Sequence, residues 1–231
     1  MDISLANQSI AVTGGFGVLG RALAEELRAA GARVALLDKA PAPAGLAEDV
    51  VALGGIDLGD AAAAREALNE VARRCGGLDG LVNVAGGFKW ETVEAGSIET
   101  WDRLYALNLR TAVLASQAAL PHLLARGGGR ILNISSPASA QAALGTGAYA
   151  ASKAGVARLT EAMAEEFKDR GITVNAVMPS TIDTPANRAD MPQADHSRWV
   201  SPRALARVLV FLLSAEAAPI NGALIPVKGR A

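Results

Sequence analysis

Apolar and polar residues follow two repeating patterns along the chain. Short apolar runs predict β-strands at residues 9–13, 33–37, 80–83, 130–134, 173–178 and 224–227. Longer stretches with helical spacing predict helices at 18–30, 60–75, 97–126, 148–170 and from 201 onward. Gly31 and Gly171 are expected to end two of these helices, and Asp60 and Ser201 to cap two others. The pattern is therefore one of strands alternating with helices.

This alternation predicts the fold class. A strand, a helix and the next strand joined by right-handed crossovers form a parallel sheet with helices on both faces. Neither a break in composition nor a repeat period divides the 231 residues. We therefore expect an α/β fold, in which residues 1–231 form a single doubly wound domain of the Rossmann type.

Composition narrows the possible partners. The formal net charge is -1 and the chain has no run of basic residues, which argues against binding to nucleic acid or to an anionic membrane. The chain start has no signal-peptide pattern, and Cys75 is the single cysteine, so a reducing, cytoplasmic location is expected. His122 and His196 are too few for a recognisable metal cluster, and no metal is predicted.

A glycine-rich turn follows the first predicted strand. In this turn Gly14, Gly17 and Gly20 permit a tight bend, close approach to a pyrophosphate and close packing of helix on strand. The N–H groups at the start of the next helix would then face the phosphates. Such a turn alone can be merely a tight connection, but its position between strand and helix favours a dinucleotide site.

Asp38 ends the second predicted strand, where this fold brings an adenosine ribose. Its carboxylate is suited to accept hydrogen bonds from two ribose hydroxyls and to repel a 2′-phosphate. The alternative is an aspartate that only caps its own loop. A cation at Lys39 softens the discrimination. We expect NAD(H) to be preferred, with NADP(H) not excluded.

Tyr149 and Lys153 lie four residues apart on a predicted helix and therefore on one face of it. A phenol with a pKa of about 10 is a poor base at neutral pH, and a nearby ammonium favours its ionised form. Ser136 follows the strand at 130–134, at the sheet edge where open α/β folds bind ligands. Read separately, the pair is a common surface spacing and the serine a common loop residue. Together they predict proton transfer to a substrate oxygen.

These motifs resemble the short-chain dehydrogenase/reductase family over essentially the whole chain. The shared features include the glycine turn, Asn83-Val84-Ala85-Gly86 and the segment 179–184. The resemblance implies a catalytic set of Asn108, Ser136, Tyr149 and Lys153. It also implies cofactor contacts at Gly14, Phe16, Gly17, Leu19, Gly20, Asp38, Asp57, Leu58, Asn83, Ala85, Gly86, Tyr149, Lys153, Pro179, Ile182 and Thr184.

Several roles follow from that resemblance alone. Asp57 would bond the adenine, Asn83 would secure the fourth strand, and Asn108 would anchor a water that passes protons to Lys153. Lys153 would also hold the nicotinamide ribose, and residues 179–184 the carboxamide. The chain departs from the family pattern in its Gly-x-x-Gly-x-x-Gly spacing, at Ser180 in place of a glycine, and at Val84 in place of an asparagine.

A narrower similarity to dihydropteridine reductase lies in the glycine turn and in the segments 84–87, 183–188 and 191–195. Three functions therefore remain open. The first is hydride transfer between NAD(H) and a carbonyl/secondary alcohol pair, with Tyr149 as general acid/base. The second is NADH-dependent reduction of a quinonoid dihydropteridine or similar ring, and the third a non-catalytic NAD-binding sensor.

The expected substrate is a small molecule, and the aromatic residues bear on its type. Phe88 and Trp90 after the fourth strand, and His196 and Trp199 before the last helix, would suit a planar or apolar substrate unless they only pack against their own loops. The resemblance further implies a homodimer or homotetramer formed through the two long helices.

Overall fold

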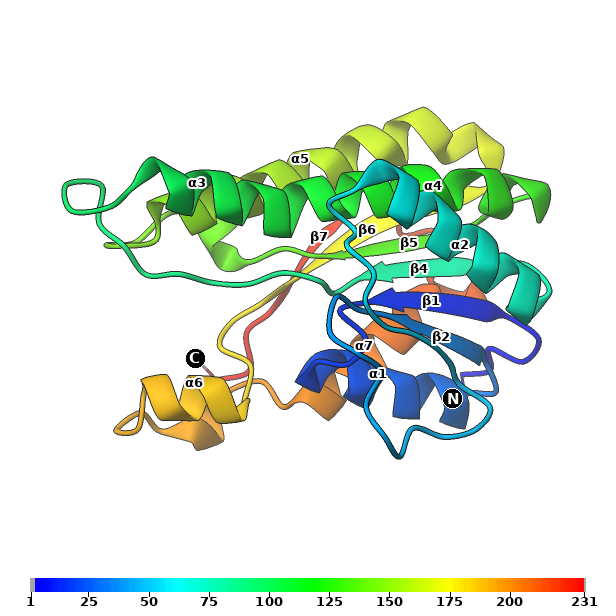
Figure 1. Ribbon diagram of the computed structural model, residues 1–231, viewed down its shortest axis with the longest axis horizontal. Coiled ribbons are helices and arrows are strands. Elements are labelled where there is room, and N and C mark those ends of the chain that lie inside the picture. Colours follow the sequence, from blue (N-terminus) through cyan, green and yellow to red (C-terminus); the bar gives the residue numbers. More distant parts are fainter. Residues whose placement is uncertain (1–2, 231) are drawn as a thin grey trace.

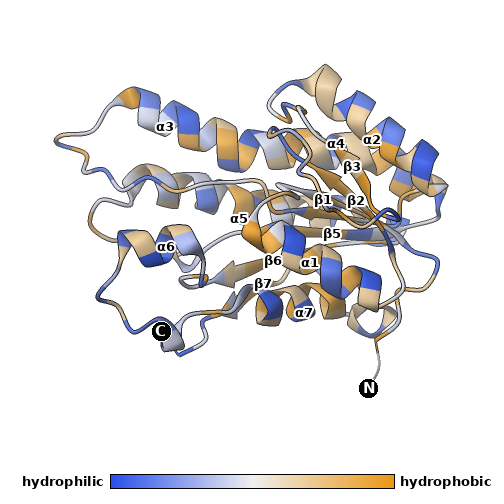
Figure 2. Ribbon diagram, turned by 60° about the horizontal axis from the view of Figure 1, so that its bottom comes forward, coloured by the Kyte–Doolittle hydropathy of each residue, from blue (hydrophilic) through white to orange (hydrophobic). Residues whose placement is uncertain are grey.

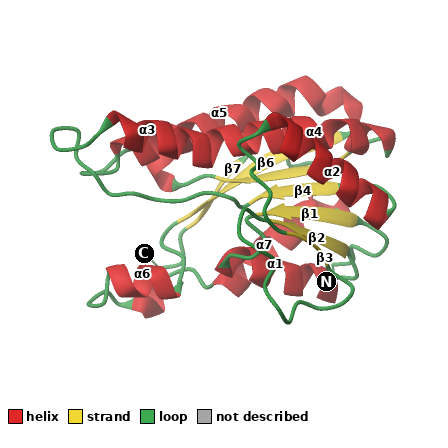
Figure 3. Cartoon of the chain, in the orientation of Figure 1, coloured by secondary structure: helices red, strands yellow, loops and turns green. Residues whose placement is uncertain are grey.

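The computed structural model describes residues 3–230. Seven parallel strands form one sheet in the order β3-β2-β1-β4-β5-β6-β7 (Figure 1, Figure 3). The strands are β1 (Ser9–Thr13), β2 (Arg33–Leu37), β3 (Val51–Leu53), β4 (Gly80–Asn83), β5 (Gly129–Ile134), β6 (Ile172–Pro179) and β7 (Leu224–Val227). The central strands are apolar because both of their faces are covered.

Helices pack on the two faces of this sheet. They are α1 (Val18–Ala29), α2 (Ala61–Cys75), α3 (Ile98–Leu104), α4 (Thr111–Ala125), α5 (Gly147–Phe167), α6 (Pro185–Asp190) and α7 (Pro202–Leu213). On one face, α1 and α7 enclose an apolar core with β1, and on the other α2, α4 and α5 enclose a second core. Apolar stripes of α1 and α7 turn toward the sheet while their polar residues face outward (Figure 2). The doubly wound prediction is confirmed.

The expected helix caps are present. The side chain of Asp60 accepts a hydrogen bond from Ala63 N at 2.8 Å, and Ser201 accepts one from Ala204 N at 3.1 Å. Gly171 has a φ of 74°, a left-handed conformation that stops the turn after α5. Within residues 3–230, no helix is both long and apolar enough to span a bilayer.

Several predicted boundaries are wrong. The long helix expected at 97–126 is divided into α3, a π-helical segment at Tyr105–Arg110, and α4, because helical spacing cannot distinguish one wider turn from regular α-helix. The helix expected to reach residue 170 ends as an α-helix at Phe167, and a 3₁₀ turn follows at Lys168–Arg170. Two short elements, β3 and α6, were not predicted because three and six residues are too few to display a period.

The order of the strands determines where a ligand can bind. From β1 the chain winds outward through β2 and β3, then returns to place β4 on the other side of β1. The helices that follow β1 and β4 therefore lie on opposite faces, and a crevice opens at the carboxyl ends of these two strands. Thr13 and Asn83 are register partners there, which puts the glycine turn beside the loop after β4.

Candidate active site

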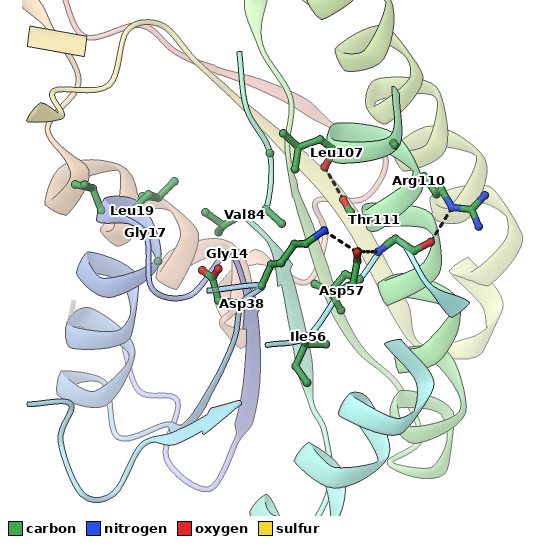
Figure 4. Close-up of a pocket in the computed structure, with 18 of the residues that line it drawn as sticks. Gly14, Gly17, Leu19, Asp38, Ile56, Asp57, Val84, Leu107, Arg110 and Thr111 are labelled. Carbon is green, nitrogen blue, oxygen red and sulfur yellow. Dashed lines mark hydrogen bonds and ion pairs between the residues drawn. The ribbon is translucent and has the colours of Figure 1, made fainter. Parts of the chain in front are cut away.

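A cleft with a volume of about 1100 Å³ lies at this crevice (Figure 4). Ten predicted cofactor contacts line it: Gly14, Gly17, Leu19, Gly20, Asp38, Asp57, Leu58, Ala85, Gly86 and Thr184. Six others do not line it: Phe16, Asn83, Tyr149, Lys153, Pro179 and Ile182. The cleft is large enough for a dinucleotide, since drug-sized ligands occupy pockets of roughly 300–1,000 Å³.

The glycine turn is packed at backbone distance against the loop after β4. Gly14 has a φ of 62°, and a Cβ there would lie 2.8 Å from Ala85 N. A Cβ on Gly20 would lie 2.5 Å from Gly14 O. Gly17 is the N-cap of α1 and supplies no side-chain cap, so the first amides of this helix suit an anion. These features fit a bound pyrophosphate.

Gly15 also requires a glycine, which the motif did not reveal. A Cβ at this position would lie 2.6 Å from the Leu36 Cβ of the neighbouring strand. The requirement comes from packing between strands that are distant in sequence, and the spacing of the glycines carries no signal of it.

Asp38 caps its own loop, which was the alternative interpretation of this residue. Its Oδ2 accepts a hydrogen bond from Phe16 N at 3.0 Å, and its Oδ1 accepts one from Ala40 N at 3.0 Å. Asp38 thereby ties the glycine turn to the end of β2 while it lines the cleft. Phe16 takes part through its backbone, and its ring packs against the core beside α1.

Lys39 forms an ion pair with a second carboxylate at this end of the cleft, that of Asp57. Its Nζ lies 2.7 Å from Asp57 Oδ2, and Asp57 Oδ1 accepts a hydrogen bond from Gly59 N at 2.9 Å (Figure 4). The hydrogen bond from Lys39 is the main reason that the pKa of Asp57 lies below its usual value. Across the cleft, Arg110 Nε donates to Gly59 O at 2.8 Å.

Lys153 is buried beneath the loop that follows β5. Its Nζ donates to Ile134 O at 2.8 Å and lies 5.9 Å from the centre of the Tyr149 ring. Loss of solvent lowers the pKa of this ammonium to about 8. Lys153 is therefore close to its own titration point at neutral to mildly basic pH.

Tyr149 faces Ser136 at the start of α5. Burial raises the pKa of Tyr149, and a hydrogen bond with Ser136 acts in the opposite direction. The sequence argument expected the Lys153 cation to lower this pKa, but desolvation is the larger influence in the protein alone. The Ser136 hydroxyl also accepts a hydrogen bond from Ala138 N at 3.2 Å.

Asn108 lies in the π-helical segment and holds the loop after β4. Its Oδ1 accepts from Gly87 N at 2.8 Å, while its Nδ2 donates to Gly87 O at 3.1 Å and to Ser152 Oγ at 2.9 Å. Ser152 Oγ donates to Tyr149 O at 2.7 Å. A Cβ on Gly86 would lie 2.7 Å from Asn108 Oδ1, which explains the glycine. The role of Asn108 in anchoring a water stays a prediction.

Asn83 lies below the cleft, where it joins three elements. Its Nδ2 donates to Ser116 Oγ at 3.1 Å and to Asn133 Oδ1 at 2.9 Å. Asn133 in turn donates to Thr160 Oγ1 at 2.9 Å. This buried chain of hydrogen bonds links β4 and β5 to α4 and α5, and the nearness of Asn83 to a bound cofactor stays a prediction.

The segment after β6 is held by its own hydrogen bonds. Thr184 caps α6 by accepting from Asn187 N at 3.2 Å, and Ile182 pairs with Val200 in an isolated bridge. Ser180, which stands in place of a family glycine, donates through its hydroxyl to Lys228 O at 2.7 Å. This departure therefore ties the segment to the end of β7 and leaves Thr184 on the wall of the cleft.

Sequence reasoning missed part of the cleft wall. Arg103, Leu107, Arg110 and Thr111 come from α3, the π-helical segment and α4. Arg103, Leu107 and Thr111 are spaced four residues apart, which was a usable signal because residues three and four apart share one face of a helix. Among the described residues, no group of three or more His, Cys, Asp or Glu side chains is placed to hold a metal ion.

Comparison with known proteins adds to this geometry. The family model described as short chain dehydrogenase matches residues 8–195. The chain is 34% identical to 2-(S)-hydroxypropyl-CoM dehydrogenase 3 of Xanthobacter autotrophicus, over 99% of this chain and 98% of the relative. It is also 34% identical to 2,5-dichloro-2,5-cyclohexadiene-1,4-diol dehydrogenase LinX of Sphingobium indicum, over 97% and 96% of the two chains.

Among solved structures, gox2181 superposes with a TM-score of 0.91 at 29% identity, over 98% of this chain and 96% of that chain. The relatives named here do not show the narrower similarity to dihydropteridine reductase, which stays a prediction.

Proposed function

The chain belongs to the short-chain dehydrogenase family, and we propose that it is an NAD(H)-dependent oxidoreductase that interconverts a secondary alcohol and a carbonyl compound. The named relatives are dehydrogenases of alcohols, which supports the reaction class. The observation that carries the proposal is the meeting of Tyr149 with Ser136, above the buried Nζ of Lys153.

The proposed roles follow from the properties of the three side chains. Bound NAD(H) would supply or accept the hydride. Tyr149 would donate its phenolic proton to the carbonyl oxygen during reduction and take it back during oxidation. Ser136 would donate a hydrogen bond to the same oxygen and stabilise the negative charge that develops there. Lys153 would favour the phenolate whenever its ammonium is charged.

The preference for NAD(H) rests on the carboxylate at the end of β2. Asp38 lines the cleft with a negative charge where a 2′-phosphate of NADP(H) would come close. Lys39, which would attract that phosphate, is already paired with Asp57. Arg110, on the opposite wall of the cleft, donates through Nε to the Gly59 carbonyl. NADP(H) is the alternative, and titration of both cofactors decides between them.

Assembly into a dimer or tetramer through the long helices remains part of the proposal. On these helices Leu114 is partly exposed, while Leu120 and Leu159 are partly exposed at the margin of the core beneath them. A cytoplasmic location stays a prediction.

The test is a screen of NADH oxidation with ketones, aldehydes, quinones and a quinonoid dihydropterin. We expect turnover with at least one ketone or aldehyde, and its loss in Tyr149→Phe. Turnover of the dihydropterin alone would overturn the proposal in favour of ring reduction. Tight NADH binding without turnover of any compound would favour a sensor.

A further inference from the structure

The loop between β4 and α3 is fastened at two points that bracket the start of α5. The first fastening is the pair of hydrogen bonds between the Asn108 amide and the backbone of Gly87. The second is the hydrogen bond from Glu91 N to Gly145 O at 2.8 Å. Residues 88–90 are therefore held beside Tyr149 by backbone contacts, whatever side chains they carry.

Two large aromatic side chains occupy this short stretch. The Phe88 ring lies edge-to-face with the Tyr149 ring, with centroids 5.0 Å apart and an interplanar angle of 84°. Trp90 lies against Gly145, where a Cβ would be 2.2 Å from Trp90 Cε2. Both side chains remain 55% exposed. Each side chain therefore has one part against the protein and one part exposed, and the Phe88 ring contacts the proposed proton donor directly.

The other loop that carries aromatic residues is built differently. There His196 and Trp199 stack on each other with ring centroids 4.4 Å apart, and His196 Nε2 lies 2.9 Å from Met191 O. That loop satisfies its own aromatic groups, as the packing alternative expected. The Phe88 and Trp90 rings instead leave apolar surface uncovered, which is costly in water unless a ligand uses it.

Two polar side chains of the 88–97 stretch, those of Glu91 and Thr92, are turned toward their own backbone. Glu91 Oε2 accepts from Ser97 N at 3.2 Å, and Thr92 Oγ1 accepts from Ala95 N at 3.3 Å. Glu91 and Thr92 therefore offer few free polar atoms to the hydroxyl groups of an open-chain polyol, whereas a flat apolar ring needs none.

We propose that Phe88 and Trp90 form an aromatic subsite that binds the apolar ring of a cyclic or aryl-substituted ketone or secondary alcohol. The inference rests on the proposed function, because it assigns the substrate class of that same site. The carbonyl carbon would sit beside Tyr149 and Ser136, and the ring would extend over the open faces of Phe88 and Trp90. Burying a ring on such a platform favours it over an open-chain substrate by on the order of tenfold or more.

The experiment compares kcat/KM with NADH for two ketones, 1-phenylpropan-2-one and 3-hydroxybutan-2-one. The variants are Phe88→Ala and Trp90→Ala, with Phe211→Ala as a matched control, because Phe211 is a partly exposed aromatic on the distant helix α7. We expect the unmodified enzyme to favour the aryl ketone at least tenfold. Trp90→Ala should lose most of that preference through a higher KM for the aryl ketone, while its turnover of the open-chain ketone stays within about twofold. Phe88→Ala should also lose the preference, with a further change in turnover of both ketones because Phe88 contacts Tyr149.

Trp90→Ala is the decisive variant, because Phe88 also touches Tyr149. If both subsite variants lower kcat/KM equally for the two ketones, or if neither variant changes it for either ketone, the subsite is overturned while the oxidoreductase function stands. Light scattering provides a second readout: loss of an oligomer in Trp90→Ala with unchanged discrimination would assign the aromatic surface to contact between copies and overturn the proposal. If no carbonyl compound is turned over, the proposed function fails, and saturation-transfer NMR of the aryl ketone on the NADH-loaded protein shows whether the ring still contacts Trp90.

Discussion

The glycine turn after β1 and the loop after β4 meet at one edge of the sheet, yet opposite means determine their shapes. The turn is shaped by missing side chains: a Cβ at Gly14 or Gly20 would lie within 2.8 Å of backbone atoms. The loop is held by an asparagine amide and displays large rings, Phe88 and Trp90. A surface made of backbone suits a ligand of fixed shape, whereas a surface made of side chains changes with each substitution. We therefore expect changes at the turn to alter cofactor binding and changes near the loop to alter substrate turnover.

Tyr149→Phe should give the largest separation of these two effects. Removing the phenolic proton should lower kcat by about 10²–10⁴-fold, the usual contribution of a general acid or base. NADH affinity should stay within a few-fold, because Tyr149 does not line the cleft wall. Stopped-flow turnover and fluorescence titration of NADH measure the two quantities. A parallel loss of NADH affinity would contradict the separation of cofactor binding from substrate turnover.

Ser136→Ala should give the next largest effect and also confine it to turnover. Losing one donor to a developing oxyanion costs about 2.7–4 kcal/mol in a well-studied site, so kcat/KM on the natural substrate should fall at least tenfold. Ser139→Ala is the matched control, because its hydroxyl contacts Met178 Sδ rather than Tyr149. Near-normal activity of Ser136→Ala, with NADH affinity and thermal unfolding unchanged, would favour reduction of a quinonoid ring.

The same comparison explains how much of the molecule could be predicted from sequence. The glycine turn, the strands and the Tyr149–Lys153 pair carry short local signals. The strands form where they were expected, and Tyr149 and Lys153 lie close together on α5. The π-helical turn at Asn108 and the hydrogen bond from Asn108 to Ser152 could not be predicted, because they depend on α5 packing against this segment, which happens only on folding. The pairing of Lys39 with Asp57 has the same origin.

Asp38→Asn should act on the cofactor side alone. The amide keeps one oxygen for the Phe16 N–H, gives up the bond from Ala40 N, and removes the charge that would repel a 2′-phosphate. We expect the ratio of NADPH to NADH dissociation constants to fall by about tenfold, the equivalent of about 1.4 kcal/mol. Asp49→Asn, a surface carboxylate paired with Arg28, is the control. Isothermal titration of both cofactors checks the result, and tighter NADPH than NADH binding by the unmodified protein would contradict the assignment.

The smallest expected effect concerns Lys153, which lies beneath the boundary between the two regions. Burial lowers the pKa of its ammonium from 10.5 to about 8. Below pH 8 both the folded and the unfolded chain carry this proton, and folding bears the full cost of burying the charge. Between pH 8 and 10.5 the unfolded chain binds more protons than the folded one, so the free energy of unfolding rises with pH.

Lys153→Met removes this contribution. From pH 7 to pH 9 the unmodified protein should gain about 1 kcal/mol of unfolding free energy that the variant does not gain, since one pKa unit corresponds to about 1.36 kcal/mol. The unfolding free energy of the variant minus that of the unmodified protein should fall by this amount. Burial also raises the pKa of Cys75 and of Tyr149, but both groups are present in both proteins and their effects largely cancel in the difference. Urea unfolding at the two pH values, with the exposed Lys228→Met as control, measures it. A difference that stays constant would mean that the Lys153 ammonium is hydrated in solution and that burial does not lower its pKa. Lys153 would then be part of the solvent-filled cleft and not of the core beneath it.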